Sequence, residues 1–246
     1  MSSTSAAVPV SGTESAVKES KERKKQLITD LIIVFLTSGV VFAYLGQLNS
    51  YVYNNEIPTI KRLLVAALFG QFVMAGLGIT IVCMIRKEKF TQFGLNTKNF
   101  VPALLLSLAC CVPDFIYQFA RGNVHAWFPF RDVYTTKQII DESFPVKVLG
   151  LLITAVCWGF FEGFNYVVLR DKISELCPSK YRFWDVGAFV CAVMCILVHV
   201  GVGVTPDALL ETLCTMILIY GMLIVRKETG NSWGCVLIFL VYWNAL

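Results

Sequence analysis

A glutamate stands inside an apolar run of this chain, in the stretch 158–172, WGFFEGFNYVVLRDK. The preceding residues, VKVLGLLITAVC, are mostly apolar, so Glu162 falls where an unpaired charge is costly in a membrane. Asn165 and Tyr166 follow at spacings of three and four residues, and a helix would place all three side chains on one face. Such a face either forms hydrogen bonds to a neighbouring helix, which helps packing in membranes, or forms a chemical site.

A histidine in a second apolar run could work together with this glutamate. His199 lies in CAVMCILVHVGVG and is one of only two histidines in the chain. A buried carboxylate can act as a general base, and a histidine beside it can donate a hydrogen bond to a developing oxyanion. The pair could therefore activate a water molecule for hydrolysis. The alternative is a neutral, buried histidine that bonds to a neighbouring helix.

A metal site would need more ligands than this pair supplies. Structural zinc binds four protein ligands and catalytic zinc binds three, whereas the spacing around Glu162 and His199 offers no third. The other histidine, His125, is expected in a loop away from both. We therefore expect no cofactor, and a zinc site is the weaker alternative.

The composition is typical of an integral membrane protein. Of the 246 residues, 56% are hydrophobic and only 15% are charged, and the mean hydropathy is +0.65. Soluble domains carry about 25% charged residues, so the composition argues against a soluble enzyme. Eight of the nine cysteines lie in apolar runs, which indicates packing residues rather than disulfides.

Apolar segments long enough to cross a bilayer recur along the chain. A crossing helix needs about 20 mostly apolar residues. Seven segments meet or approach this length: 27–48, 63–85, 100–119, 147–169, 185–204, 207–225 and 232–246. The last has about 15 residues and is short for a full crossing. The sequence thus predicts an all-α, polytopic transmembrane helix bundle of about seven spans, surrounded by bilayer lipid.

The Lys and Arg residues are distributed unevenly between the two sides of this bundle. With the N-terminus inside, the inside segments carry 15 of them and the outside segments carry 6. Cytoplasmic loops are enriched in Lys and Arg, so we expect a multi-pass protein, in the plasma membrane, with a cytoplasmic N-terminus. The basic segment at 18–26 fits a flank of the first span better than a nucleic-acid-binding arm, so no nucleic-acid partner is expected.

The predicted spans divide the chain into three regions. Residues 1–26 form a polar tail, expected to be disordered, that ends in the basic flank. Residues 27–145 hold three spans and an interfacial loop, and residues 146–246 hold a membrane core of four spans. The loop 120–146 contains Trp and Phe residues that suit the headgroup region, with a lid or a substrate surface as the alternative.

The fourth predicted span should continue beyond its apolar part. No Gly or Pro interrupts YVVLRDKISEL, so this helix is expected to run to about residue 175. At about 1.5 Å per residue, such a helix places Glu162, His199 and Asn244 at comparable depths. Spans four, five and seven would then meet around these three side chains.

The C-terminal part of the chain resembles a known family. The segment 220–244, YGMLIVRKETGNSWGCVLIFLVYWN, is similar to a motif of the CPBP intramembrane proteases, the group of the type II CAAX prenyl endopeptidases and bacteriocin-processing or immunity proteins. Glu162 lies where the first Glu of the family's EExxxR motif stands, and His199 matches the His of its FxxxH motif. Asn244 matches the Asn of HxxxN, and the resemblance covers about residues 150–246.

The resemblance implies a glutamate-dependent endopeptidase that cleaves a membrane-associated peptide or protein. Glu162 would be the base for the attacking water, while His199 and Asn244 would hold the water or the oxyanion. Three further residues would support this catalytic site: Asn165, Tyr166 and Arg170.

Four positions depart from the family's pattern. They are Gly163 for the second Glu, Val167 for the Arg, Cys195 for the Phe and Leu240 for the His. Since loss of one oxyanion donor lowers a rate by about 10²–10³, the alternative is a catalytically inactive member that acts as a membrane binding or bacteriocin-immunity protein. A transporter or channel is a third hypothesis, although the sequence lacks clearly broken spans in matched halves.

Overall fold

The computed structural model describes residues 11–124, 126–199 and 205–245, except for the side chains of residues 11–15 and 199. Within these ranges every regular element is a helix, which confirms the all-α prediction. The elements are α1 Ser11–Ala43, α2 Leu45–Val52, α3 Thr59–Val65, η1 Ala66–Leu77, α4 Gly78–Arg86, η2 Phe90–Phe93, α5 Phe100–Ala120, α6 Thr136–Asp141, α7 Val146–Thr154, η3 Ala155–Phe161, α8 Glu162–Leu176, α9 Val186–His199, α10 Pro206–Thr229 and α11 Trp233–Val241.

Five helices are long and apolar enough to cross a membrane, judged by length and composition. Two of them are composite: α3, η1 and α4 run continuously over Thr59–Arg86, and α7, η3 and α8 run over Val146–Leu176. The other three are Ala16–Ala43, Phe100–Ala120 and Pro206–Thr229. Apolar helices of this length agree with the prediction of a membrane protein.

The two remaining predicted spans correspond to shorter helices. The apolar part of α9 covers Val186–Val198, and α11 has only nine residues. A helix of nine residues is about 14 Å long, about half of the hydrocarbon core of a bilayer. The predicted number of about seven spans is therefore roughly consistent with five long helices and two short ones.

The helix that carries Glu162 continues as far as the sequence predicts. α8 ends at Leu176, without a break after the apolar residues. Gly187, at the start of α9, has no room for a Cβ because the carbonyl oxygen of Arg170 lies against it. This close approach lets α9 pack directly along α8.

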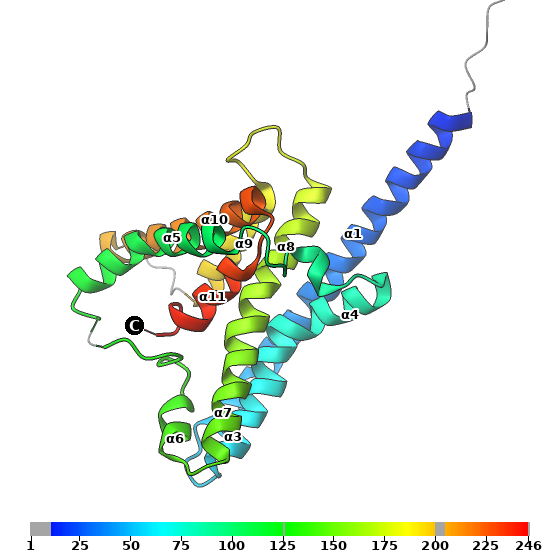
Figure 1. Ribbon diagram of the computed structural model, residues 1–246. Helices are drawn as coiled ribbons and strands as arrows, with labels where there is room; N and C mark the ends of the chain where they lie inside the picture. Colours follow the sequence, from blue (N-terminus) through cyan, green and yellow to red (C-terminus); the bar gives the residue numbers. More distant parts are fainter. Residues whose placement is uncertain (1–10, 125, 200–204, 246) are drawn as a thin grey trace, which may run out of the picture.

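The long helix of α7, η3 and α8 separates two groups of helices (Figure 1). α1 and the composite helix of α3, η1 and α4 pack on one side of it. On the other side lie α5, α9, α10 and α11, in which α5 and α10 run side by side. The main apolar core lies where these two groups meet and includes Phe164, Leu218 and Phe239, all fully buried.

Helix α1 begins before the apolar residues of its span. Residues 11–26, which the sequence places in the polar tail and the basic flank, are helical. Lys, Glu, Arg and Gln dominate residues 18–26 and are strong helix formers. In addition, Nε of Arg23 lies 2.6 Å from Oε1 of Glu175 at the end of α8, which ties this extension to the bundle.

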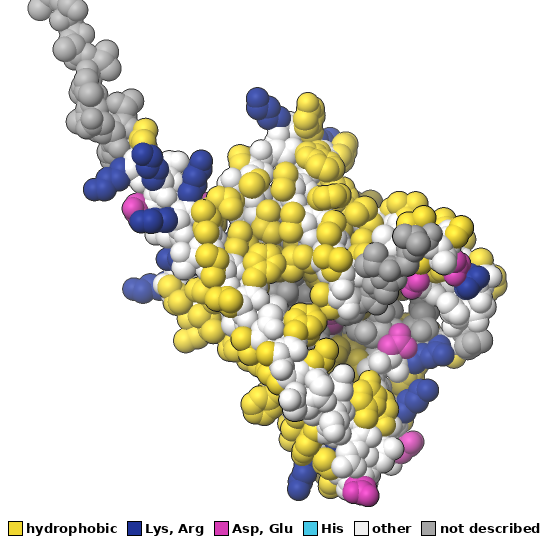
Figure 2. Space-filling model, turned by 180° about the vertical axis from the view of Figure 1, so that it is seen from behind, with side chains coloured by type: hydrophobic (Ala, Val, Ile, Leu, Met, Phe, Trp, Pro, Cys, Tyr) yellow, Lys and Arg dark blue, Asp and Glu magenta, His cyan; other side chains and the backbone are white. Residues whose placement is uncertain are grey.

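The outer surface of the helices is strongly apolar. Figure 2 shows hydrophobic side chains over much of one face, with Lys and Arg side chains gathered near the beginning of α1. Large side chains such as Leu36, Met84 and Phe119 are more than 60% exposed. Continuous apolar patches of this kind on a helical protein indicate contact with lipid.

The charged residues at the end of α8 form buried ion pairs. Nζ of Lys172 lies 2.9 Å from Asp30 of α1 and 2.8 Å from Glu88, and Arg86 binds the other oxygen of Asp30 at 2.8 Å. The side chains of Asp30 and Lys172 are almost completely buried. These contacts fix α1, α4 and α8 relative to one another, because a buried charge without its partner is strongly destabilising.

Candidate functional site

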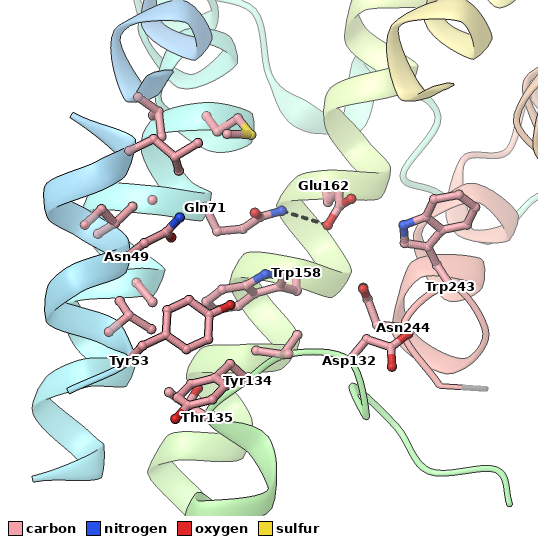
Figure 3. Close-up of a pocket in the computed structure, with 18 of the residues that line it drawn as sticks. Asn49, Tyr53, Gln71, Asp132, Tyr134, Thr135, Trp158, Glu162, Trp243 and Asn244 are labelled. Carbon is pink, nitrogen blue, oxygen red and sulfur yellow. Dashed lines mark hydrogen bonds between the residues drawn. The ribbon is translucent and has the colours of Figure 1, made fainter. Parts of the chain in front are cut away.

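Glu162 lines a cavity of about 530 Å³ between the two groups of helices (Figure 3). Residues of α1, α2, η1, α5, η3, α8 and α10 form its walls, together with the segments after α2, before α6 and after α11. Among the described lining residues are four carboxylates and four amides: Asp114, Asp132, Glu162, Glu211, Asn49, Gln71, Gln118 and Asn244. Helices far apart in the sequence thus place a polar cavity inside an apolar bundle.

The carboxylate of Glu162 is held by an amide from another helix. Only 5% of Glu162 is exposed, and Nε2 of Gln71 donates to its Oε2 over 2.7 Å (Figure 3). Gln71 is 91 positions earlier in the chain, so no local spacing pairs the two residues. Gln71 was not among the site residues predicted from the sequence. The one feature of the sequence that points to it is the presence of an amide side chain within an apolar run.

Two π-helical segments shape this part of the cavity. η1 carries Gln71, while η3 carries Trp158 and ends immediately before Glu162. The two segments pack through Phe72 and Phe161, whose ring centroids are 4.9 Å apart. π-Helical turns are rare and often mark functional sites, and here both of them supply cavity-lining side chains.

Asn244 lies in the same cavity as Glu162, as the predicted site requires. Its backbone carbonyl accepts a hydrogen bond from the N–H of Asp132 at 3.2 Å, and the N–H of Phe128 donates to Ala245 at 3.0 Å. Nε1 of Trp127 donates to the carbonyl of Val241 at 2.6 Å. The loop before α6 therefore holds the chain just after α11 and positions Asn244.

The carboxamide nitrogen of Asn244 is available as a hydrogen-bond donor. Its Nδ2 atom is buried and has no hydrogen-bond partner among the residues that the structure describes. Buried polar groups are nearly always satisfied, so this donor is suited to a molecule inside the cavity. A carbonyl oxygen or an oxyanion would accept a hydrogen bond from it.

The positions that depart from the family's motifs are closely packed. A Cβ at Gly163 would lie 2.9 Å from the carbonyl oxygen of Cys235 and 3.0 Å from Cα of Val236, so no larger residue fits without movement of α11. A Cβ at Gly159 would likewise collide with Leu240. The tight contact of α8 and η3 with α11 thus excludes a second glutamate at 163 and places Leu240 against Gly159.

The three predicted supporting residues have different surroundings. Asn165 is 8% exposed, and Tyr166 stacks on Phe239 with ring centroids 5.5 Å apart. Neither is among the described residues that line the cavity. All residues of α8 from Glu162 to Arg170 are buried, and Asn165 and Tyr166 pack in the core beside the cavity.

Arg170 lies away from Glu162 and forms ion pairs instead. Eight residues along a helix correspond to about 12 Å, which takes Arg170 towards the far end of α8. Nε of Arg170 donates to Asp185 at 3.2 Å and NH1 lies 2.8 Å from Asp171. The structure therefore does not bring Arg170 to the cavity.

Asp185, in the loop before α9, is stabilised in its charged form. Burial acts to raise the pKa of its carboxyl group, but hydrogen bonds from Arg170, from Ser174 and from the N–H of Ala188 outweigh it, and the pKa is lowered. The charged carboxylate of Asp185 thus accepts several hydrogen bonds, which favour it over the protonated form. These contacts connect the end of α8 with the beginning of α9.

His199 is the last residue of α9, and its side chain lies outside the described part of the structure. The residues that follow it, 200–204, lie outside as well. The predicted role of His199 therefore remains a prediction from the sequence. Among the described residues, no group of three or more His, Cys, Asp or Glu side chains could hold a metal ion.

No protein-family model matches this chain, and neither a curated protein nor a solved structure matches it significantly. The features of the chain that bear on its function are the cavity, Glu162 with its partner Gln71, and the motif resemblance.

Proposed function

We propose that this chain is an intramembrane endopeptidase of the CPBP type, embedded in the plasma membrane with its N-terminus in the cytoplasm. Its substrate is a membrane-associated peptide or protein. The observation that carries this proposal is the buried Glu162 carboxylate, held by Gln71 at 2.7 Å in a cavity that Asn244 also lines. A positioned carboxylate and a free amide donor are the two groups that hydrolysis of a peptide bond needs.

The reaction follows from these two groups. Glu162 takes a proton from a water molecule, whose oxygen attacks the carbonyl carbon of the scissile peptide bond. The tetrahedral oxyanion accepts a hydrogen bond from Nδ2 of Asn244, and His199 supplies a second donor in this scheme. The carbon–nitrogen bond then breaks, the amine leaves with the proton from Glu162, and the new carboxyl group forms.

The test uses the purified full chain in nanodiscs with a mixture of synthetic membrane-spanning peptides, and mass spectrometry identifies the cleavage products. Glu162→Gln should abolish cleavage, and Asn244→Ala should lower the rate by about 10²–10³. Asp141→Asn, an exposed change in α6 outside the cavity, should leave the rate unchanged. Cleavage that survives both Glu162→Gln and His199→Ala would refute the mechanism.

The second candidate is a membrane binding or immunity protein without catalytic activity. The packing of Gly163 against the backbone of α11 favours it, because this contact leaves no room for a second glutamate. This candidate predicts that the chain cleaves none of the peptides, and that Glu162→Gln leaves its biological function intact. Cleavage by the wild-type chain and the effect of Glu162→Gln on biological function therefore separate the two candidates.

A further inference from the structure

The cavity around Glu162 combines negative charge with aromatic rings. Four of its described lining residues are carboxylates: Asp114, Asp132, Glu162 and Glu211. Four others are aromatic: Tyr53, Tyr134, Trp158 and Trp243 (Figure 3). No Lys or Arg occurs among the lining residues that the structure describes. Carboxylates attract cations, and aromatic faces bind them through their quadrupoles.

The four carboxylates differ in how far they are buried. Asp132 is exposed and Glu211 is half-buried, whereas Asp114 and Glu162 are 7% and 5% exposed. Asp114 accepts a hydrogen bond of 2.7 Å from the hydroxyl of Tyr242, and Glu162 accepts one from Gln71. The two buried carboxylates thus have neutral donors, and Asp132 and Glu211 are the more exposed pair.

A second observation indicates that the cavity accommodates a polar ligand. Thr135, which lines the cavity, is 1% exposed, and its hydroxyl has no hydrogen-bond partner within the described ranges. Buried hydroxyl groups are usually hydrogen-bonded, so an entering donor would satisfy this one. An ammonium or guanidinium group carries several N–H donors and could bond to the hydroxyl and to a carboxylate together.

The wall of the cavity already contains one contact between a cation and an aromatic ring. The guanidinium carbon of Arg62, which does not line the cavity, lies 5.8 Å from the centre of the Tyr134 ring. Arg62 is itself held by the carbonyl of Val52 at 3.3 Å and by Asn55 at 3.0 Å. This contact shows that the aromatic wall is compatible with a positively charged group, although Arg62 is committed to its own partners.

We propose that this cavity binds a lysine or arginine side chain of the membrane-associated peptide, with Asp132 and Glu211 as the residues that select positive charge. The inference rests on the proposed endopeptidase function, which it extends by naming the substrate class. Charge selection by these two residues would place the scissile bond next to a basic residue, near Glu162 and Asn244.

The test measures binding separately from cleavage. Two fluorescent membrane-spanning peptides, identical except for one lysine or norleucine near the end of the apolar segment, are titrated with the full chain in uncharged detergent micelles. The Glu162→Gln variant is used, so that cleavage does not interfere. We expect the lysine peptide to bind about tenfold more tightly than the norleucine peptide, a difference of about 1.4 kcal/mol.

Three variants, each also carrying Glu162→Gln, locate the selectivity within the molecule. Asp132→Asn and Glu211→Gln should each reduce the tenfold preference to about two- or threefold. Asp141→Asn, which removes the same charge from exposed α6 outside the cavity, should leave it unchanged. Size-exclusion chromatography confirms folding, and if the Asp132→Asn variant fails to fold, the Glu211→Gln variant alone tests the proposal.

The outcomes separate this inference from the proposed function. Equal affinity for the lysine and norleucine peptides would overturn the inference, even if the wild-type chain cleaves both. The inference would also be overturned if Asp141→Asn reduced the preference for the lysine peptide as much as the two cavity variants do. The preference would then depend on the overall charge of the chain. A tenfold preference without any cleavage by the wild-type chain would support the cation site and count against the endopeptidase.

Discussion

Gln71 donates a hydrogen bond from Nε2 to Oε2 of Glu162 at 2.7 Å, and this contact joins the two π-helical regions of the bundle. The donor comes from η1, and the acceptor is the first residue after η3. A hydrogen bond to a charged group contributes about 1.5–3 kcal/mol. The contact therefore fixes the orientation of the Glu162 carboxylate at the wall of the cavity.

If Gln71 positions Glu162, Gln71→Leu should lower kcat by about 10- to 100-fold and change KM little, since the loss affects the orientation of the base. Steady-state kinetics with a cleaved peptide would measure both constants. Gln47→Leu, an exposed change on α2 outside the cavity, is the matched control. A change in KM alone would assign Gln71 to substrate binding instead.

Gly163 should not tolerate even a methyl group. Gly163→Ala puts a Cβ 2.9 Å from the carbonyl oxygen of Cys235, and because this obstacle is backbone, α11 must move. We expect a loss of about 1–3 kcal/mol in the free energy of unfolding, measured as a lower Tm in detergent.

The control for Gly163→Ala is Gly39→Ala in α1, where a Cβ meets nothing within 4 Å. Replacing glycine with alanine in a helix is favourable by up to about 1 kcal/mol, so Gly39→Ala should keep or raise the Tm. Equal effects of the two changes would contradict the close approach of α8 and α11. Gly163→Glu, which restores the family's second glutamate, should be more damaging still.

Lys172 should be important for stability at the end of α8. Lys172→Met removes the partner that Asp30 and Glu88 share at 2.9 and 2.8 Å. Breaking a buried ion pair costs about 3–5 kcal/mol. Arg23→Gln, which breaks a pair whose side chains are 40% and 45% exposed, should cost less than about 1 kcal/mol. Thermal unfolding of both variants tests whether Lys172→Met is the more destabilising change. A larger loss of stability in Arg23→Gln would contradict the prediction.

Asp185 should make the stability depend on acid pH. Because its pKa is lowered in the folded chain, its contribution is present above the ordinary pKa of an aspartate, about 3.9, and is lost as the pH falls below this value. Asp185→Asn should therefore be less stable than wild type at pH 7, and the difference should shrink towards pH 3. A constant difference in Tm between these pH values would show that the contribution is not electrostatic.

Much of the fold could be predicted from the sequence because local composition determines it. A long apolar run must form a helix in lipid, since each backbone polar group needs a partner within the segment. The extension of α8 to Leu176 followed from the lack of Gly or Pro, and the short final segment indicated the short α11. The π-helical turns in η1 and η3 were not predictable from these patterns, because they depend on packing between helices.

The candidate site was predictable only in part. The spacing of Glu162, Asn165 and Tyr166 predicted a common polar face, but all residues of α8 from Glu162 to Arg170 are buried and, of these three, only Glu162 lines the cavity. Arg170 was predicted as a supporting residue, yet its ion pairs with Asp171 and Asp185 take it away from the site. Helical spacing determines on which side of a helix a side chain lies, while the packing of neighbouring helices determines which residues it contacts.

The sequence by itself determined a helical chain with long apolar segments and a glutamate inside one of them, since hydropathy and spacing are local properties. Only the tertiary structure decided that Gln71 bonds to Glu162, that Asn244 lines the same cavity, and that Gly163 packs against the backbone of Cys235. These contacts join residues that are distant in the sequence, and the packing of complete helices sets their geometry.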